Sequence, residues 1–259
     1  MNRRLVRLLV TAGAGLLLGL VAARLGIELY TNALWYGSVG YSDVFWRRLL
    51  VSGLVQVVAA VVAAAIVLAN LGVLARRLGT IQLRRRYGNL EIAEQVPRGY
   101  LRLVILVVAA LSGWWLAAVE FGGGAGIDVL AWARRVDWNL ADPLFGHDLS
   151  FYVFSLPLYA RVYTLVLLSV LWSLILVTAG YALLGMLRWE HNRPQLGEPA
   201  RLHFVVLATS LLALLAIRFW LARYDVLLNG TGVREAVGYT DVTARLPARA
   251  ALAGLALVA

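Results

Sequence analysis

The residues best suited to chemistry lie in one short stretch, ADPLFGHDLSFYVFSLPLY, at positions 141–159. Asp142, His147 and Asp148 fall within seven residues of one another, and carboxylates and imidazole rings are ligands for divalent cations. The stretch offers no evident fourth ligand, and aspartates in such loops commonly close their own turns. We therefore expect the two aspartates to form turns, and a cation site at the three residues is the alternative.

A hydrolase at this cluster would need a nucleophile, and Ser150 or Ser155 would have to serve. Neither serine has the surrounding pattern that places a nucleophile on a strained turn. The chain also holds no cysteine and no lysine, which excludes disulfides, thiolate metal centres, P-loop lysines and Schiff-base lysines. We expect no cofactor and no enzymatic activity. A membrane-embedded enzyme that uses Asp142, His147 and Asp148 is the least favoured alternative.

The composition points to a membrane. Hydrophobic residues make up 61% of the 259 residues and charged residues 15%, against about 45–50% and about 25% in soluble domains. A helix that crosses the hydrocarbon needs about 20 mostly apolar residues. Five intervals between charges are long enough once their edge residues snorkel or the helix extends, and they predict complete spans over about 5–25, 49–74, 101–119, 158–187 and 202–222. The ten apolar residues after Arg249 are too few to cross, so we expect a sixth span, over 246–259, that is truncated.

These spans predict an all-α fold, a polytopic transmembrane helix bundle over residues 1–259, because lipid offers the backbone no hydrogen-bond partners. Short interfacial helices and an ordered outer loop should join the spans, and one such helix is expected over 127–138. A cleaved signal peptide is the alternative for the first span, since a basic start and Val21-Ala22-Ala23 fit that pattern. The length of the apolar stretch and the four later spans favour an uncleaved anchor.

The distribution of arginine predicts the orientation. With the N-terminus in the cytoplasm, the inner segments 1–7, 76–102 and 188–201 hold 13 Arg in 48 residues. The outer segments, counted as 24–48, 120–161 and 218–249, hold 11 Arg in 99 residues. Cytoplasmic loops are the ones enriched in basic residues, so we expect loops 24–48, 120–157 and 223–249 to face outside. The most basic inner loop, 76–102, is interpreted as contacting lipid headgroups. We expect no nucleic-acid partner, because the loop lacks interleaved aromatic residues.

Three polar residues of the predicted spans are candidates for a site or a path: Gln56, Asn70 and Arg218. Polar residues in spans usually form hydrogen bonds across helices, and an ionisable residue there is a functional candidate. Arg218 lies near the outer end of its span, where it can reach the interface or meet Asp225. We favour a role in anchoring. His203, next to an inner loop, is interpreted as a solvated or capping side chain.

Three motifs carry a resemblance to a known family. The stretch 141–159 resembles the "DP.FG.D.SFYVF.LP.Y" signature of the UPF0182 membrane proteins of bacteria, with His147 as a minor departure. LWYGSVGYSDVFWRRLL, at 34–50, resembles the first-loop motif of that family, and the segment 223–249 resembles a third. The outer-loop positions taken from these matches are Asp142, Pro143, Phe145, Gly146, Asp148, Phe151, Tyr152, Phe154, Pro157, Arg223, Tyr224, Asp225, Tyr239, Thr240 and Asp241.

The resemblance implies several N-terminal transmembrane helices followed by a large extracytoplasmic domain, which would lie beyond residue 259. It implies a multi-pass protein of the bacterial inner (cytoplasmic) membrane, and it brings no catalytic residue. We therefore expect an anchor or scaffold for that domain or for a complex. Its partners would be the lipid bilayer and other membrane or extracytoplasmic proteins. A transporter or channel for an unknown, lipid-like solute is the alternative.

Overall fold

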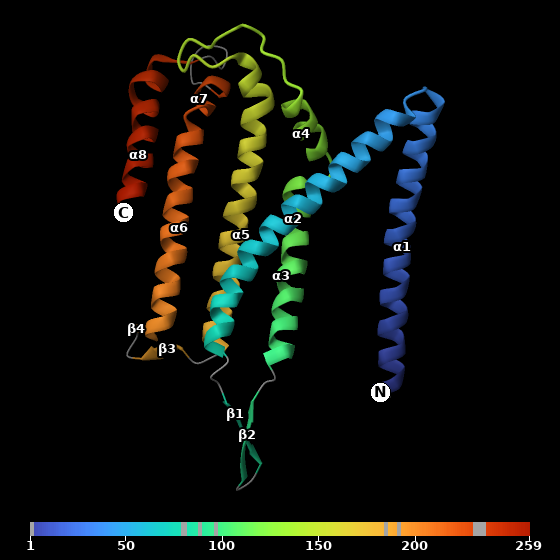
Figure 1. The fold of residues 1–259 in the computed structure, drawn as a ribbon, viewed down its shortest axis with the longest axis vertical. Helices are drawn as coiled ribbons and strands as arrows, with labels where there is room; N and C mark the ends of the chain where they lie inside the picture. The colour runs from blue at the N-terminus through green and yellow to red at the C-terminus, as the bar shows by residue number, and fades with distance from the viewer. Residues whose placement is uncertain are drawn as a thin grey trace. The chain divides into compact units, whose positions relative to one another are not determined.

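The computed structural model describes residues 3–78, 82–87, 90–95, 98–183, 186–190, 193–229 and 237–259. The elements, with η for a π-helical turn, follow one another as α1 (Arg3–Ser38), α2 (Ser42–Leu78), β1 (Gln82–Tyr87), β2 (Leu90–Gln95), α3 (Arg98–Phe121), α4 (Ala125–Ala133), η1 (Phe151–Ser155), α5 (Leu156–Leu183), β3 (Leu187–Glu190), β4 (Arg193–Leu196), α6 (Glu198–Ala222), α7 (Asp225–Leu228), η3 (Asp241–Arg245) and α8 (Leu246–Val258) (Figure 1). The chain consists of two units, Met1–Val51 and Ser52–Ala259.

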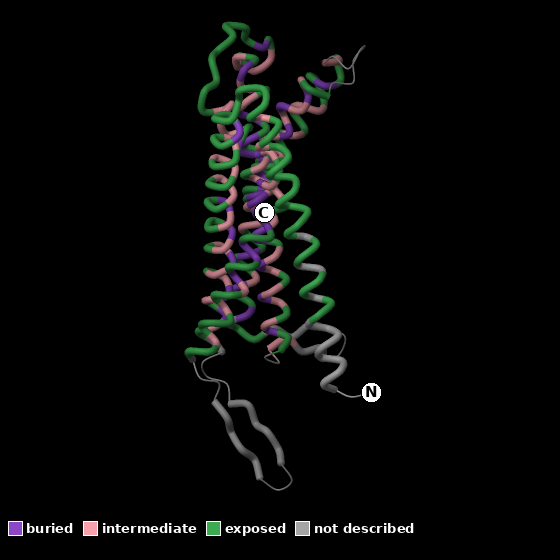
Figure 2. The backbone as a smooth tube through the Cα atoms, turned by 90° about the vertical axis from the view of Figure 1, so that its right-hand side faces the viewer, coloured by how far each residue is buried: buried purple, intermediate pink, exposed green. Residues whose placement is uncertain are grey.

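The predominantly helical fold is confirmed. Among the described residues, four helices are long and apolar enough to cross a membrane: Ser42–Arg76, Gly99–Phe121, Phe151–Leu183 and Ala200–Ala222. They coincide with four of the predicted spans. In the most apolar part of Ala200–Ala222 only 17% of the residues are buried inside the protein. Exposed residues cover much of the helices in Figure 2, as expected where lipid would surround them.

The other two predicted spans fall in α1 and α8, which are not among those four helices. α1 extends well past the predicted end of the first span, and α8 begins where the sixth span was expected. The helix predicted over 127–138 is present as α4, which begins two residues earlier and ends at Ala133; its position at the membrane interface stays a prediction.

In the first unit, a tight turn joins α1 to the start of α2. Gly40 has a φ of +79°, a left-handed conformation that glycine adopts without strain. The amide of Gly40 donates to the carbonyl of Gly37 at 3.2 Å, and the amide of Tyr41 donates to the carbonyl of Tyr36 at 2.8 Å. The rings of Tyr36 and Phe45 pack 5.5 Å apart across this turn. Two aromatic residues of the 34–50 motif, Tyr36 and Phe45, therefore close a helical hairpin.

Two β-hairpins replace parts of the predicted basic loops. β1 pairs with β2 in antiparallel register, from Gln82 opposite Gln95 to Tyr87 opposite Leu90, and β3 pairs with β4 in the same sense. One hairpin connects α2 to α3 and the other connects α5 to α6, at one end of these helices (Figure 1). The purely helical prediction missed them. Backbone N–H and C=O groups outside a helix need other hydrogen-bond partners. In a hairpin, two strands of six residues or fewer supply these partners to each other.

The core of the second unit forms where α2, from Ser52 onward, faces α3, α5 and α6. Small residues let the helices approach closely. A Cβ atom built on Gly113 of α3 would lie 2.6 Å from the Cβ atom of Ala64 in α2. Gly180 of α5 would meet the side chain of Leu74 in the same way. The neighbouring residues Ala63 and Val67 of α2 are fully buried, so α2 is held by contacts that larger residues would block.

Arg161 of α5 joins three helices at the other end of the unit. Its guanidinium donates to the carbonyl of Glu120 in α3 at 2.8 Å and pairs with the carboxylate of Asp128 in α4 at 3.0 Å. The salt bridge is partly exposed, so its main effect is geometric. It fixes where α4 leaves α3 and, therefore, where the loop after α4 begins.

The close contact between α2 and α3 predicts that a larger residue at Gly113 destabilises the protein. Gly113→Leu should lower the free energy of unfolding by about 1–3 kcal/mol, because the side chain has no space against Ala64. Gly53→Leu is the matched control, since a Cβ there meets nothing within 4 Å. Unfolding of the purified protein by SDS titration would measure both. Equal stability of the two variants would contradict the packing described for α2.

Candidate functional site

The 134–150 loop, which runs from the end of α4 to η1, lies at the end of the helices opposite the hairpins (Figure 1). Ala141 and Asp148 form an isolated antiparallel bridge. The amide of Asp142 donates to the carbonyl of His147 at 2.8 Å, and that of Leu149 donates to Leu140 at 2.9 Å. The bridge closes a tight turn.

The carboxylate of Asp142 lies at the centre of that turn and is 5% exposed. Its Oδ1 accepts hydrogen bonds from the amides of Leu144 and Phe145 at 2.8 and 2.6 Å. Its Oδ2 accepts from the amide of His147 at 2.8 Å and from the hydroxyl of Tyr152 at 2.7 Å. Three loop amides and one residue of η1 therefore depend on a single side chain.

The carboxylate of Asp148 accepts hydrogen bonds from residues before and after the turn. Its Oδ1 accepts from the amides of Trp138 and Ser150 at 3.1 and 2.8 Å, and its Oδ2 accepts from the amide of Leu140 at 3.1 Å. The hydroxyl and amide of Ser150, with the amides of Trp138 and Leu140, hold the pKa of Asp148 well below its ordinary value. For Asp142, burial acts to raise the pKa, but the hydrogen bonds from Phe145, Tyr152 and the other loop donors outweigh it, so that pKa is also lowered.

Aromatic rings bring the two C-terminal family motifs together. The ring of His147 stacks on Phe151 at 4.6 Å, and its Nε2 lies 3.3 Å from the hydroxyl of Tyr224, just beyond α6. Tyr224 is buried, and its ring packs 5.0 Å from Phe145 and 6.0 Å from Tyr152. Residues some 80 positions apart in the sequence thus form one cluster at the same end of the helices.

Asp241 provides a second buried carboxylate, in the π-helical turn η3 that leads into α8. It is fully buried, and it accepts from the amide of Gly238 at 2.9 Å and from the guanidinium of Arg245 at 2.8 Å. Arg245 is partly exposed, so one side of this ion pair faces outward. Asp241 therefore orders the entry into α8 much as Asp142 orders the turn before α5.

The remaining motif residues are placed around these two carboxylates. The ring of Phe154 lies 6.0 Å from that of Trp138, and Pro157 is in the first turn of α5. Pro143 is exposed within the turn, and Gly146 has a φ of +70°. The guanidinium of Arg223 stacks 3.3 Å above the ring of Trp220. Tyr239 is 83% exposed, and the neighbouring Thr240 precedes η3. The motif segment 230–236 lies outside the described residues.

The geometry does not favour the cation-site alternative at Asp142, His147 and Asp148. The carboxylate oxygens accept hydrogen bonds from separate sets of donors, and the imidazole is held between rings. Across the described part of the chain, no group of three His, Cys, Asp or Glu side chains is arranged to hold a metal ion. The hydroxyl of Ser150 contacts Asp137 at 3.4 Å, and that of Ser155 is buried without a partner. The cluster is built to order a loop.

Within the candidate spans, a chain of polar contacts joins three helices. The hydroxyl of Tyr181 in α5 lies 3.2 Å from Nδ1 of His203 in α6, whose Nε2 lies 3.1 Å from the amide oxygen of Asn70 in α2. Asn70 in turn donates to the carbonyl of Ile66 at 2.8 Å. His203 is 6% exposed, so its interpretation as a solvated or capping residue is wrong. A neutral imidazole satisfies both neighbours, one by accepting and one by donating.

Tyr181 was not among the residues predicted from the sequence, and His203 was assigned a different role. Both residues lie in apolar helices far from Asn70 in the sequence, so their contacts could not be anticipated. Gln56 is half-buried on α2, and none of the described residues forms a hydrogen bond with its side chain. Arg218 and Asp225 line one cavity without forming an ion pair, so the proposed contact between them is not made.

The lowered pKa values predict an acid-sensitive loop. A depressed folded-state pKa stabilises the protein above the unfolded value, near pH 4, and this stabilisation is lost as the pH falls through the folded value. Asp142→Asn should cost about 1–3 kcal/mol of unfolding free energy at pH 7, because amide nitrogen cannot accept hydrogen bonds. The difference from wild type should shrink towards pH 3.

SDS unfolding at pH 7, 5 and 3 would measure this. Asp137→Asn is the control, since the carboxylate of Asp137 accepts only a long bond from Ser150. A constant difference between wild type and Asp142→Asn at all three pH values would contradict the described role of the Asp142 carboxylate.

Comparisons with known proteins agree with the motifs. Residues 8–259 match the model of a family described as an uncharacterised protein family (UPF0182). A UPF0182 protein of Mycobacterium bovis (strain BCG / Pasteur 1173P2) is 33% identical over 262 residues, which are 97% of this chain and 26% of the relative. A second UPF0182 protein of that strain is 31% identical over 261 residues, 97% of this chain and 25% of the relative.

A UPF0182 protein of Mycobacterium tuberculosis (strain ATCC 25177 / H37Ra) is likewise 33% identical, with 97% of this chain and 26% of the relative covered. The chain thus spans about a quarter of the length of the curated relatives it matches. No solved structure matches. With a family model that covers nearly all of its residues, the chain belongs to the UPF0182 family.

Proposed function

We propose that this chain is the membrane anchor of a larger protein and that the 134–150 loop is the platform on which the remainder of that protein docks. The apolar face of the 134–150 loop is the observation that carries the proposal. Val136 is 73% exposed, Leu140 is 58% exposed and Trp138 is 48% exposed. Exposed apolar side chains that lie close together in the chain are candidates for an interaction site on a protein surface.

The same residues are held in a fixed arrangement, which favours docking over random exposure. The amides of Trp138 and Leu140 donate to the carboxylate of Asp148, and Leu140 also accepts from Leu149. A loop whose backbone is fixed loses little conformational entropy when a partner covers it. The lowered pKa of Asp148 keeps its carboxylate charged, and the arrangement stable, at neutral pH.

The length of the relatives supports the choice of partner. The matched relatives are about four times as long as this chain, so the remaining three quarters of such a protein is available to cover the loop. In a protein of the relatives' length, the 134–150 loop and this remainder would belong to one polypeptide. A covalently attached partner has a high effective concentration, so even a small interface is occupied.

A transporter or channel is the alternative, and the polar contacts favour it less. A transport path needs polar groups that face a cavity and can bind a solute. Asn70, His203 and Tyr181 instead bind one another, and the hydroxyls of Ser169 and Ser173 donate to carbonyls of their own helix. Such closed contacts stabilise a bundle.

The proposed topology has five complete spans and a truncated sixth, with the N-terminus in the cytoplasm. The alternation of α2, α3, α5, α6 and α8 supports it, because the two arginine-rich hairpins then lie on one side and the 134–150 loop on the other. The side with the higher density of arginine is the cytoplasmic one. The platform would then face the extracytoplasmic space of a bacterial cell.

The docking proposal predicts protection of the apolar face. In the full-length protein, a cysteine at Val136 or Leu140 should react with a soluble maleimide about tenfold more slowly than a cysteine at Asn229, which is also exposed outside the candidate spans. In the 259-residue chain alone, the three positions should react at similar rates. Equal rates in the full-length protein would contradict docking on this face.

The topology predicts opposite labelling at the two ends of the helices. In intact cells that make the protein, a membrane-impermeant maleimide should label a cysteine at Arg135, in the 134–150 loop. A cysteine at Ala93, in β2, should be labelled only after the membrane is permeabilised. The chain contains no cysteine of its own, so the background from this segment is absent. The reverse pattern would overturn the orientation while leaving the helical fold untouched.

A further inference from the structure

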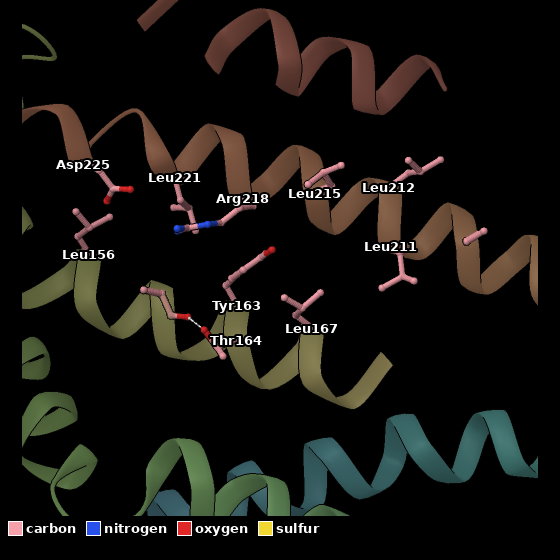
Figure 3. A pocket seen from close by; sticks show the side chains of 12 residues that line it. Leu156, Tyr163, Thr164, Leu167, Leu211, Leu212, Leu215, Arg218, Leu221 and Asp225 are labelled. Carbon is pink, nitrogen blue, oxygen red and sulfur yellow. Dashed lines mark hydrogen bonds between the residues drawn. The ribbon is translucent and has the colours of Figure 1, made fainter. Parts of the chain in front are cut away.

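A cavity of about 910 Å³ lies between α5 and α6, close to the end that carries the 134–150 loop. Its walls are mostly leucine and alanine side chains, and Figure 3 shows Leu167 of α5 and Leu211 of α6 pointing toward one another between the two helices. Leu215, on α6, is 42% exposed, so the cavity opens to the outside of the bundle. Since both helices are candidate spans, that outside is where lipid would lie.

Three polar side chains, those of Tyr163, Arg218 and Asp225, also line this cavity. Figure 3 shows the guanidinium of Arg218 and the hydroxyl of Tyr163 between the helices, with the carboxylate of Asp225 beyond them. Among the described residues, none forms an ion pair or a hydrogen bond with these three side-chain groups. An arginine without a partner beside an apolar cavity calls for an anionic group, because leaving such a charge unpaired is costly.

The order of the groups along α6 is that of a phospholipid. Ala208 and Leu211 line the deep part of the cavity, and Arg218 follows about 15 Å from Ala208, at 1.5 Å per residue. Asp225 follows, beyond the end of α6 at Ala222. An acyl chain, a phosphate and an ammonium group occur in the same order in a zwitterionic phospholipid. Arg218 also lies about 6 Å from the helix end, the depth of a headgroup.

We propose that this cavity binds a phospholipid with an ethanolamine headgroup, from the leaflet on the side of the 134–150 loop. The acyl chain fills the space between Leu167 and Leu211, and the phosphate accepts hydrogen bonds from Arg218 and Tyr163. The primary amine of the headgroup donates to the carboxylate of Asp225. A headgroup without the amine would leave that carboxylate facing a phosphate, and like charges repel.

The test uses the full-length protein, purified in detergent, stripped of lipid and titrated with phosphatidylethanolamine or phosphatidylglycerol under native mass spectrometry. Wild type should bind phosphatidylethanolamine about tenfold more tightly than phosphatidylglycerol, the ratio for one charge-assisted hydrogen bond. Arg218→Gln should weaken both lipids at least tenfold. Asp225→Asn should remove the preference between the two lipids.

Arg223→Gln is the matched control, because Arg223 lies at the same end but stacks on Trp220 and does not line the cavity. It should bind both lipids as wild type does. Equal affinity of wild type for the two lipids, or equal affinities of Arg218→Gln and Arg223→Gln, would overturn the proposal. Asp225 lies outside the candidate spans, so Asp225→Asn decides the matter even if Arg218→Gln does not fold.

Discussion

A helix that crosses hydrocarbon has to satisfy its backbone polar groups within itself, and this constraint places the irregular backbone of the chain at the helix ends. At one end the backbone pairs across the two hairpins. At the other end the connecting segments are longer, and side-chain carboxylates accept hydrogen bonds from their backbone amides. Asp142 and Asp148 together accept hydrogen bonds from six backbone amides of the 134–150 loop. The loop keeps one shape because these two side chains are charged.

That shape has consequences for the rest of the second unit. The hydroxyl of Tyr152 ties the turn around Asp142 to the start of α5, and Tyr224 ties it to the end of α6. The same end carries the cavity with Arg218 and Asp225. An ordered platform and a lipid site are compatible roles, since a lipid beside α5 and α6 would hold these two helices at the spacing that the aromatic cluster requires. Both proposals place function at the end of the helices and leave the interior of the bundle to packing.

The sequence predicted the parts that follow from length and hydropathy. Apolar intervals located α3, α5 and α6 to within four residues and α2 to within seven, because a span needs about 20 mostly apolar residues. The sequence also predicted turn-forming roles for Asp142 and Asp148, which the hydrogen bonds of both residues describe in detail. The hairpins were missed, since their short strands contain arginine where alternation of apolar and polar residues would be diagnostic.

The contacts between distant segments could not be predicted from one sequence. Asn70 and His203 are 133 residues apart, and nothing in their local patterns indicates that one faces the other. The contact between His147 and Tyr224 could not be predicted either, for the same reason. The spacing of Arg218 and Asp225 allowed a contact between them as an alternative to anchoring, but the two side chains line a shared cavity without forming an ion pair. Packing decides such contacts, and packing depends on helix rotation, which hydropathy leaves open.

The most direct test of the account is a structure of the full-length protein in lipid nanodiscs, determined by cryo-EM. The account predicts that the part of the chain beyond these helices covers Val136 and Leu140 while the turn around Asp142 keeps its hydrogen bonds. A 134–150 loop that faces solvent, with the remainder of the protein held elsewhere, would contradict the central claim that this loop is the platform for docking.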